Sequence, residues 1–233
     1  MDIVYPRTCL VCKNNLKGQA SIDDFVCNGC WSKIKKNPPP FCHCCGRHLD
    51  TKNPVKNICL NCLKTKFHFD RAFSPCLYEG VAKELIHQFK YKNKDYLGPT
   101  LARLMTEFIK EYDLPMDCID VIVPVPLHKT RLREREFNQA QVLGSAVARE
   151  FVKDIRSSAL VRLRHTRTQT ELDEEKRFQN VRDGFAVAGA QNLKGSNILL
   201  VDDVLTTGAT SSEAACALKK AGANIVFVLT LAN

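Results

Sequence analysis

Apolar residues in the C-terminal two thirds of the chain follow helical spacing in several segments. In residues 97–112 they return every third or fourth position, which predicts an amphipathic helix. Residues 139–152 and 210–221 also predict helices, and Gly222 follows the last of them at a position where glycine favours a helix end.

Short apolar runs between these helices predict buried strands. The runs are VIVPVPL at residues 121–127, which ends at prolines, then residues 198–201 and residues 224–231. Strands that alternate with helices indicate an α/β fold with a mostly parallel sheet. In such a fold, ligands bind at the carboxyl ends of the strands.

Composition indicates a folded protein with a small N-terminal appendage. The 233 residues are 45% apolar and 25% charged, close to a globular average. Cys, Lys and Asn are frequent before residue 65, and the periodic patterns follow it. We therefore expect one domain at residues 1–65 and another at residues 66–233. The first residues contain no signal-like apolar segment, and no run of about 18 apolar residues occurs, so we expect a cytoplasmic protein without membrane insertion.

The net charge of +9 is carried by the front of the chain. Residues 1–65 contain 10 Lys and Arg against 4 Asp and Glu, and residues 66–110 contain 8 against 5. The remaining residues are balanced at 16 against 16. The positive charge of residues 1–110 would therefore attract a polyanionic partner to this part of the chain.

Cysteine spacing predicts two metal sites in the N-terminal segment. Nine of the 12 cysteines lie in the first 62 residues, and eight of them form four CxxC pairs. Two intervening residues let both thiolates of a tight turn face one ion, and two such turns complete a tetrahedron. Metal binding would also supply folding free energy to a segment too short to build a core. The eight predicted ligands are Cys9, Cys12, Cys27, Cys30, Cys42, Cys45, Cys59 and Cys62.

Several features of these sites stay open at the level of sequence. The pairs can combine sequentially, or the first pair can combine with the third. Cys44 is a spare thiol, and Cys45 is the preferred ligand because it keeps the CxxC spacing. Two structural zinc ions are the favoured occupants, since closed all-thiolate sites are rarely catalytic. An iron–sulfur cluster is the alternative.

The stretch ILLVDDVLTTGAT at residues 198–210 predicts a phosphate site. A strand delivers Asp202 and Asp203, and a turn of small hydroxyl residues and glycine then opens a helix. Successive backbone N–H groups at a helix N-terminus bind an anion, and strand-end carboxylates accept hydrogen bonds from sugar hydroxyls. These features together indicate a ribose phosphate ligand. The phosphate-cradling residues are Thr206, Thr207, Gly208, Ala209 and Thr210.

This stretch resembles the signature of type I phosphoribosyltransferases, which bind 5-phosphoribosyl-1-pyrophosphate (PRPP) with magnesium. The four CxxC pairs, VPVPLH at residues 123–128, and RLRER with FNQA at residues 131–140 resemble the ComF/GntX family of competence-associated proteins. FDRAF at residues 69–73 and YEG at residues 78–80 extend this resemblance to nearly the whole chain. It implies a double zinc ribbon followed by a phosphoribosyltransferase-like fold.

The resemblance also implies roles for individual residues. Asp202 and Asp203 would hold the ribose hydroxyls, and the turn after them the 5-phosphate. Val125 and Pro126 would belong to the pyrophosphate loop. Arg131 and Arg135 suit pyrophosphate because guanidinium engages phosphate bidentately, and a solvated helix face is the alternative explanation. The flap would include Gln169 and Thr170.

One residue departs from the family pattern, and one catalytic role is unassigned. The family usually has glycine before Phe-Asn-Gln, whereas this chain has Glu136. A carboxylate there would weaken pyrophosphate binding unless it points to solvent. Magnesium would neutralise the departing pyrophosphate. No convincing general base is identified, and His128 and His165 are candidates by residue type alone.

The segment FKYKNKDY at residues 89–96 interleaves lysines with aromatic rings. Ammonium groups beside stacking faces suit single-stranded DNA, although a lysine-rich turn after a helix would look the same. The candidate DNA contacts are Lys90, Tyr91, Lys92 and Lys94. The family resemblance implies a role in DNA uptake together with a DNA-translocating ATPase.

Three functions follow. The favoured one is a PRPP-binding, phosphoribosyltransferase-like protein that acts in DNA uptake. The second is a non-catalytic DNA-binding competence factor whose PRPP fold is a ligand-binding relic. The third is a protein that traffics metal or iron–sulfur clusters.

Overall fold

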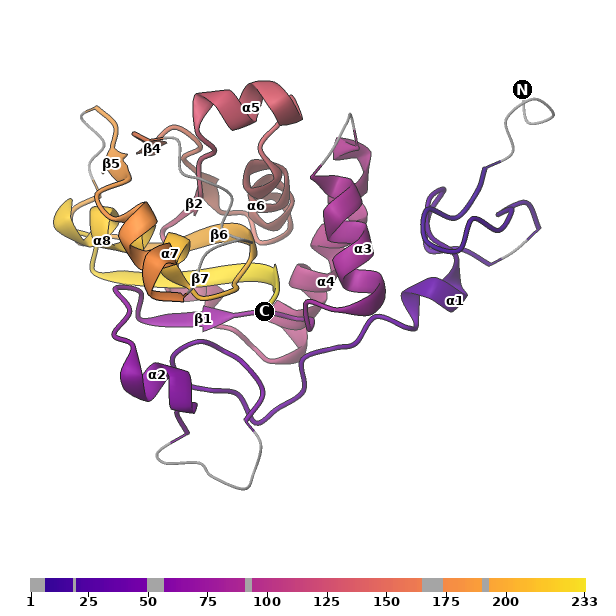
Figure 1. Ribbon diagram of the computed structural model, residues 1–233, viewed down its shortest axis with the longest axis horizontal. Coiled ribbons are helices and arrows are strands. Elements are labelled where there is room, and N and C mark those ends of the chain that lie inside the picture. The colour runs from indigo at the N-terminus through magenta and orange to yellow at the C-terminus, as the bar shows by residue number, and fades with distance from the viewer. Residues whose placement is uncertain (1–6, 19, 50–56, 91–93, 165–173, 190–192) are drawn as a thin grey trace.

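A computed structural model describes residues 7–18, 20–49, 57–90, 94–164, 174–189 and 193–233. Figure 1 shows the arrangement of their helices and strands. No helix in these ranges is both long and apolar enough to cross a membrane. The helices are α1 (Asn28–Trp31), α2 (Leu60–Lys64), α3 (Gly80–Phe89), α4 (Gly98–Glu111), α5 (Lys129–Arg135), α6 (Gln139–Glu150), α7 (Glu174–Val181) and α8 (Ala209–Lys220), with 3₁₀ turns η1 (Asp95–Leu97) and η2 (Met116–Cys118).

The larger part of the chain is built on a five-stranded parallel sheet, with strand order β1-β7-β6-β2-β3. The register places Val123 of β2 beside Leu200 of β6, and Leu200 beside Val228 of β7. The carboxyl ends of these strands therefore reach one edge together. The strands are β1 (Arg71–Phe73), β2 (Val121–Pro124), β3 (Asp154–Ile155), β6 (Asn197–Val204) and β7 (Ile225–Ala232).

Successive side chains of a strand point to opposite faces of the sheet. Both faces of this sheet are buried. Ile122, Leu199 and Leu229 pack with residues of α3, α4 and α6 on one face. Val123 and Leu200 pack with residues of α8 on the other face. This explains why the strands appear in the sequence as continuous apolar runs.

A separate antiparallel hairpin lies near the carboxyl edge of the sheet. It consists of β4 (Leu160–Arg162) and β5 (Phe185–Val187). Helix α7 comes between these strands in sequence and lies beside α8 in Figure 1. The amide of Asp183, just after α7, donates to Glu213 of α8 at 2.8 Å. The hairpin and α7 thus bring residues from the middle of the chain to the end of β6.

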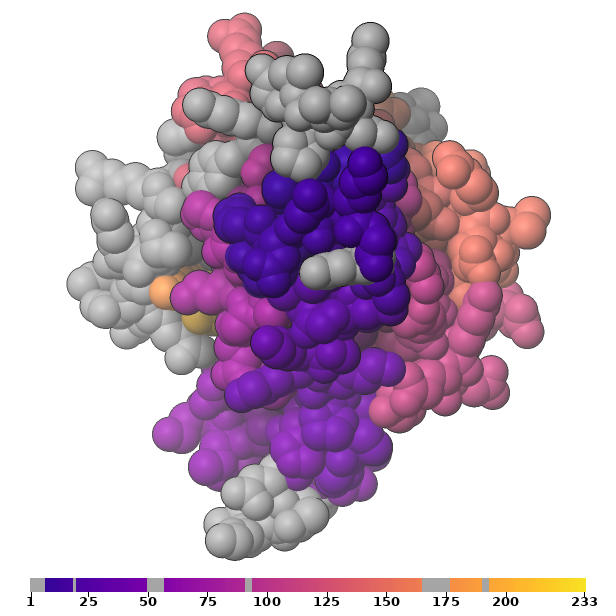
Figure 2. Space-filling model, turned by 90° about the vertical axis from the view of Figure 1, so that its right-hand side faces the viewer, coloured from indigo at the N-terminus to yellow at the C-terminus, as the bar shows by residue number. Residues whose placement is uncertain are grey.

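The first cysteine-rich ribbon packs against the helices α3 and α4, which cover one face of the sheet. Its residues share an apolar cluster with α3 and α4, and Figure 2 shows it lying over this side of the molecule. Gln88 of α3 donates to the Leu10 carbonyl at 2.9 Å, and the ring of Phe25 lies 4.3 Å from that of Tyr96.

The second ribbon packs at the β1 edge and joins the apolar cluster of the opposite face. The Ala72 amide of β1 donates to the Cys44 carbonyl at 2.8 Å. Gly46 lies so close to β1 that a Cβ there would be 2.3 Å from the Ala72 oxygen. The two ribbons therefore sit on different sides of the sheet, and the second protects an edge strand from pairing with another chain.

The main periodic segments form the predicted elements, with small changes in their bounds. The helix predicted at residues 97–112 is α4, and the strand predicted at residues 198–201 extends through Asp202 and Asp203 to Val204. The strand predicted at residues 121–127 ends at Pro124. It ends earlier because proline cannot donate to the sheet ladder.

Candidate functional site

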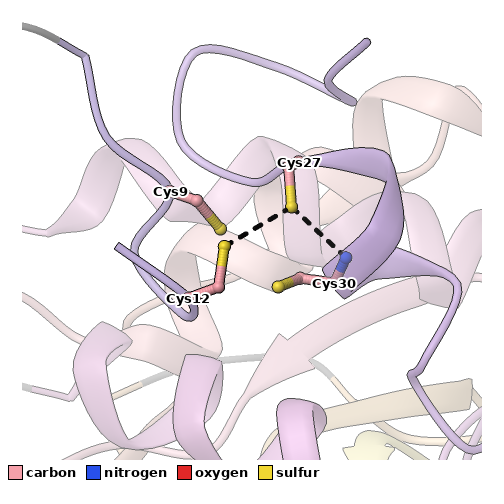
Figure 3. A group of neighbouring side chains, drawn as sticks. All are labelled: Cys9, Cys12, Cys27 and Cys30. Atoms are coloured by element: carbon pink, nitrogen blue, oxygen red, sulfur yellow. Dashed lines mark hydrogen bonds between the residues drawn. The ribbon is translucent and has the colours of Figure 1, made fainter. Parts of the chain in front are cut away.

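Four cysteines of the first ribbon converge on one point (Figure 3). Cys27 is the N-cap of α1, and its sulfur accepts a hydrogen bond from the Cys30 amide at 3.4 Å. The Cys12 and Cys27 sulfurs lie 3.8 Å apart. A tetrahedron with zinc–sulfur bonds of about 2.3 Å requires sulfurs separated by about 3.8 Å. The first tetrad therefore fits a zinc ion.

The second tetrad consists of Cys42, Cys45, Cys59 and Cys62. The Cys45 and Cys59 sulfurs lie 3.6 Å apart, and the Cys42 sulfur accepts from the Cys59 amide at 3.3 Å. All four ligand atoms lie within 4.8 Å of one another, as they do in the first tetrad. The CxxC pairs therefore combine sequentially, and Cys45 rather than Cys44 belongs to the second tetrad.

The two adjacent carboxylates stand at the end of β6. Asp202 accepts the Asp203 amide at 2.8 Å, and Asp203 lies 3.1 Å from the Lys90 ammonium. Burial raises the pKa of Asp202 to about 7, and the charge of Asp203 acts in the same direction, against Lys90 and Arg162. Asp202 is thus a carboxyl group whose ionised form is disfavoured by its surroundings.

Cations from several elements surround these carboxylates. Lys90 at the end of α3 has a raised pKa, because the attraction of Asp203 outweighs its desolvation by burial. Arg162 of β4 has a lowered pKa, because burial and the charges of Arg131 and Arg135 outweigh the attraction of Asp202. Lys90 and Arg162 thus act on the Asp202 carboxyl, and Arg131 and Arg135 act on Arg162. This concentration of basic groups suits a polyanionic ligand.

The turn after β6 presents unpaired backbone donors. Leu205 donates to the Ala232 carbonyl at 2.9 Å, whereas the N–H groups of Thr206, Thr207 and Gly208 have no acceptor within the described part of the chain. Gly208, with φ +80°, is the N-cap of α8. A Cβ on Gly208 would also come within 2.7 Å of the Phe67 ring. The turn therefore has the free donors that an anion site requires, and Ala209 and Thr210 begin the helix behind it.

The end of β2 lies beside the carboxylates. Val125 donates to the Val201 carbonyl at 2.8 Å and accepts from Asn138 at 3.1 Å, and Pro126 follows it. Asn138 also caps α6. Arg135 donates to Gln139 at 3.1 Å, which links the end of α5 to α6.

Glu136 adopts the left-handed conformation, with φ +68°, at the end of α5. Its side chain is exposed. The glycine that the family usually has here matches this backbone conformation, which L-residues with a Cβ adopt at a cost.

A cleft of about 340 Å³ lies between the second ribbon and the turn after β6. Asn233 follows β7 and Tyr78 follows β1, so the cleft opens at the carboxyl edge of the sheet. Arg47 from the ribbon and Arg177 from α7 line it together with the ring of Phe67. The second metal site therefore borders the predicted phosphate turn.

Several predicted residues are placed differently or fall outside the described ranges. Lys90, a candidate DNA contact, is largely buried against Asp203, and Lys94 donates to Gln88 at 2.7 Å. Tyr91, Lys92, His165, Gln169 and Thr170 lie outside the described residues. His128 caps α5 through its ring nitrogen, which accepts the Thr130 amide.

Sequence reasoning missed two features of the site. Arg162 comes from a hairpin strand too short to be recognised by period. In the sequence, Arg47 is only one of the basic residues of the first 65, yet in the structure it contacts the carbonyl groups of the turn. No local signal in the sequence indicated either contact, because each joins segments far apart in the chain.

Comparison with known proteins gives the same two parts. A family model for a double zinc ribbon domain matches residues 1–63, and one for a phosphoribosyl transferase domain matches residues 138–233. Competence protein F of Haemophilus influenzae is 31% identical over 97% of this chain and 96% of its own length. Competence protein ComFC of Bacillus subtilis is 28% identical, over 98% and 95%. The DNA utilization protein YhgH of Escherichia coli K12 is 29% identical, over 98% of both chains.

Among solved structures, a glutamine PRPP amidotransferase from B. subtilis is 23% identical over 58% of this chain and 25% of its own, with a TM-score of 0.36. The cysteine tetrads, the parallel sheet and the matched domains define a double zinc-ribbon protein with a phosphoribosyltransferase domain. Its similarity to competence protein F over nearly the whole length shows that the chain belongs to the ComF family.

Proposed function

We propose that the chain binds PRPP with magnesium at the carboxyl edge of its sheet, as a phosphoribosyltransferase-like protein of DNA uptake. The observation that carries the proposal is the juxtaposition at the end of β6. Two carboxylates there are followed directly by a turn whose N–H groups at residues 206–208 have no acceptor among the described residues, and basic side chains lie nearby. Carboxylates suit ribose hydroxyls, the turn suits a phosphate monoester, and the cations suit pyrophosphate.

In this proposal, different residues bind different parts of PRPP. Asp202 and Asp203 bind the ribose hydroxyls, and the turn from Thr206 to Thr210 binds the 5-phosphate. Arg131 and Arg135, with the loop at Val125, bind the pyrophosphate. Binding would also favour the ionised form of Asp202, because hydrogen bonds from the hydroxyls stabilise a carboxylate.

Magnesium would arrive with the ligand. The described residues hold no cluster of three or more metal-binding side chains besides the cysteine tetrads. Magnesium commonly keeps water molecules and binds substrate phosphates with only one or two carboxylates, so such a cluster is not required. Bound there, it would neutralise charge on the pyrophosphate.

The role in DNA uptake is supported by the names of the relatives, which are competence and DNA utilization proteins. Contact with single-stranded DNA is supported by the basic balance of residues 1–110. A DNA-translocating ATPase of the competence machinery is the proposed protein partner, and the cytoplasm the proposed compartment.

Calorimetric titration of the full chain with PRPP and magnesium tests the proposal. The wild type should release or absorb heat that saturates, and the double variant Asp202→Asn with Asp203→Asn should lose this signal. Glu134→Gln, an exposed carboxylate on α5, is the matched control and should bind like the wild type. An absence of heat with the wild type, or unchanged heat with the double variant, would refute PRPP binding at this site.

A binding role without turnover is the second candidate. It is favoured by the placement of His128, whose ring nitrogen accepts the Thr130 amide and so caps α5. Incubation with radiolabelled PRPP and a panel of bases distinguishes the two. A phosphoribosylated product supports an enzyme, whereas binding without any product supports a ligand-sensing or relic site.

A further inference from the structure

The second ribbon contacts the turn after β6 through the side chain of Arg47. The Nη2 atom of its guanidinium donates to the Thr206 carbonyl and lies 3.5 Å from the Leu205 carbonyl oxygen. Arg47 is half-buried, so water competes less for this charge-assisted contact than it would on an open surface.

The ribbon holds Arg47 from two sides. The Arg47 carbonyl accepts the amide of Cys42, a cysteine of the second tetrad, at 2.7 Å. Arg47 also follows Cys45, another cysteine of that tetrad, by two residues. The neighbouring Gly46 is pressed against β1, and its carbonyl accepts from the buried Asn37 at 2.8 Å. The metal site and the sheet edge therefore fix the base of the Arg47 side chain.

The contact determines which way the turn's amides face. In a trans peptide unit, the C=O of one residue and the N–H of the next point in opposite directions. A guanidinium that holds the Leu205 and Thr206 carbonyls on the ribbon side therefore directs the N–H groups of Thr206 and Thr207 away from it. These N–H groups are among the donors without an acceptor in the described chain.

We propose that Arg47 is a positioning residue for phosphate binding, which makes the second zinc ribbon a working part of the ligand site. The described contacts of the first ribbon are instead with α3, η1 and α4. The inference rests on the proposed function in that the turn must bind the phosphate of the ligand.

Binding of PRPP with magnesium to Arg47→Ala, Arg47→Lys and Arg7→Ala tests the inference. Arg7 pairs with the exposed Asp24 within the first ribbon and is the matched control. Arg47→Ala should weaken binding roughly ten- to hundredfold, the loss expected for a charge-assisted hydrogen bond. Arg47→Lys should recover part of the affinity, and Arg7→Ala should bind like the wild type. The zinc content of all three should equal that of the wild type.

Amide hydrogen exchange without ligand provides a second readout. Residues 204–212 should exchange faster in Arg47→Ala than in the wild type or Arg7→Ala, because the turn loses its anchor. Unchanged exchange would overturn the inference whether or not the protein binds PRPP, and so would wild-type affinity in Arg47→Ala. Faster exchange in a protein that does not bind PRPP would support the role of Arg47 in holding the turn and refute the proposed function instead.

Discussion

The ammonium of Lys90 lies 3.1 Å from the carboxylate of Asp203, and only 19% and 16% of the two side chains are exposed. Lys90 ends α3, which packs against the first ribbon, whereas Asp203 lies near the end of β6. The pair therefore joins the basic front of the chain to the ligand edge of the sheet. The structure thus places Lys90 at the proposed ligand site, beside Asp203.

Replacement of Lys90 by Gln should destabilise the protein at neutral pH and weaken PRPP binding. Asp203 would lose its counter-charge beside Asp202, and an unpaired, largely buried carboxylate costs on the order of 1–3 kcal/mol. Urea unfolding and PRPP titration measure the two effects. Lys94→Gln is the control, since Lys94 bonds to neutral Gln88. If Lys90→Gln leaves stability and PRPP affinity unchanged but lowers affinity for single-stranded DNA, Lys90 acts as a DNA contact.

Asp202 should make the stability of the protein fall as the pH rises. Its pKa is raised to about 7 in the folded protein, so the folded state holds the proton more tightly than the unfolded state. The stabilising contribution of this proton is complete below about pH 4, the pKa of the carboxyl in the unfolded chain, and is lost as the pH rises through about 7. Above that pH, the half-buried charge opposes folding.

Asp202→Asn removes this charge and keeps the oxygen that accepts the Asp203 amide. The variant should exceed the wild type in unfolding free energy by roughly 1–3 kcal/mol at about pH 8, and by less at about pH 5.5. Comparison of the two proteins at each pH cancels any loss of zinc in acid. An Asn variant that is less stable than the wild type at both pH values would show that the ionised carboxylate is not penalised.

Three arginines of α5 provide an internally controlled test of the pyrophosphate role. Arg131 and Arg135 are half-buried and act electrostatically on Arg162, whereas Arg133 is exposed. Arg131→Gln and Arg135→Gln should each weaken PRPP binding about tenfold or more, because a charge-assisted contact to phosphate is lost. Arg133→Gln should bind almost like the wild type. Equal losses in all three variants would mean that only the net charge of α5 matters.

The local parts of this site could be predicted from sequence, and the contacts between distant segments could not. Asp202, Asp203 and the turn after them follow an apolar run, so their place at a strand end is a local property. The contact of Lys90 with Asp203 depends on how α3 packs against the sheet. Likewise, no pattern around Arg47 indicates that the second ribbon lies against the turn. Contacts of this kind depend on tertiary packing, which local periodicity does not encode.

Glu136 allows the effects of backbone and charge to be separated. Glycine adopts its left-handed conformation without a Cβ penalty, so Glu136→Gly should raise the unfolding free energy by roughly 0.5–1 kcal/mol despite the greater freedom of the unfolded chain. Arg133→Gly, inside the same helix, should lower it by a similar amount.

Glu136→Gln removes the charge and leaves the backbone requirement in place. Because the Glu136 side chain is exposed, PRPP affinity of the Gln variant should equal that of the wild type. A clear gain in affinity with both Gln and Gly would show instead that the carboxylate opposes the pyrophosphate. Urea unfolding together with PRPP titration of the two variants therefore decides whether the departure from glycine concerns stability or ligand binding.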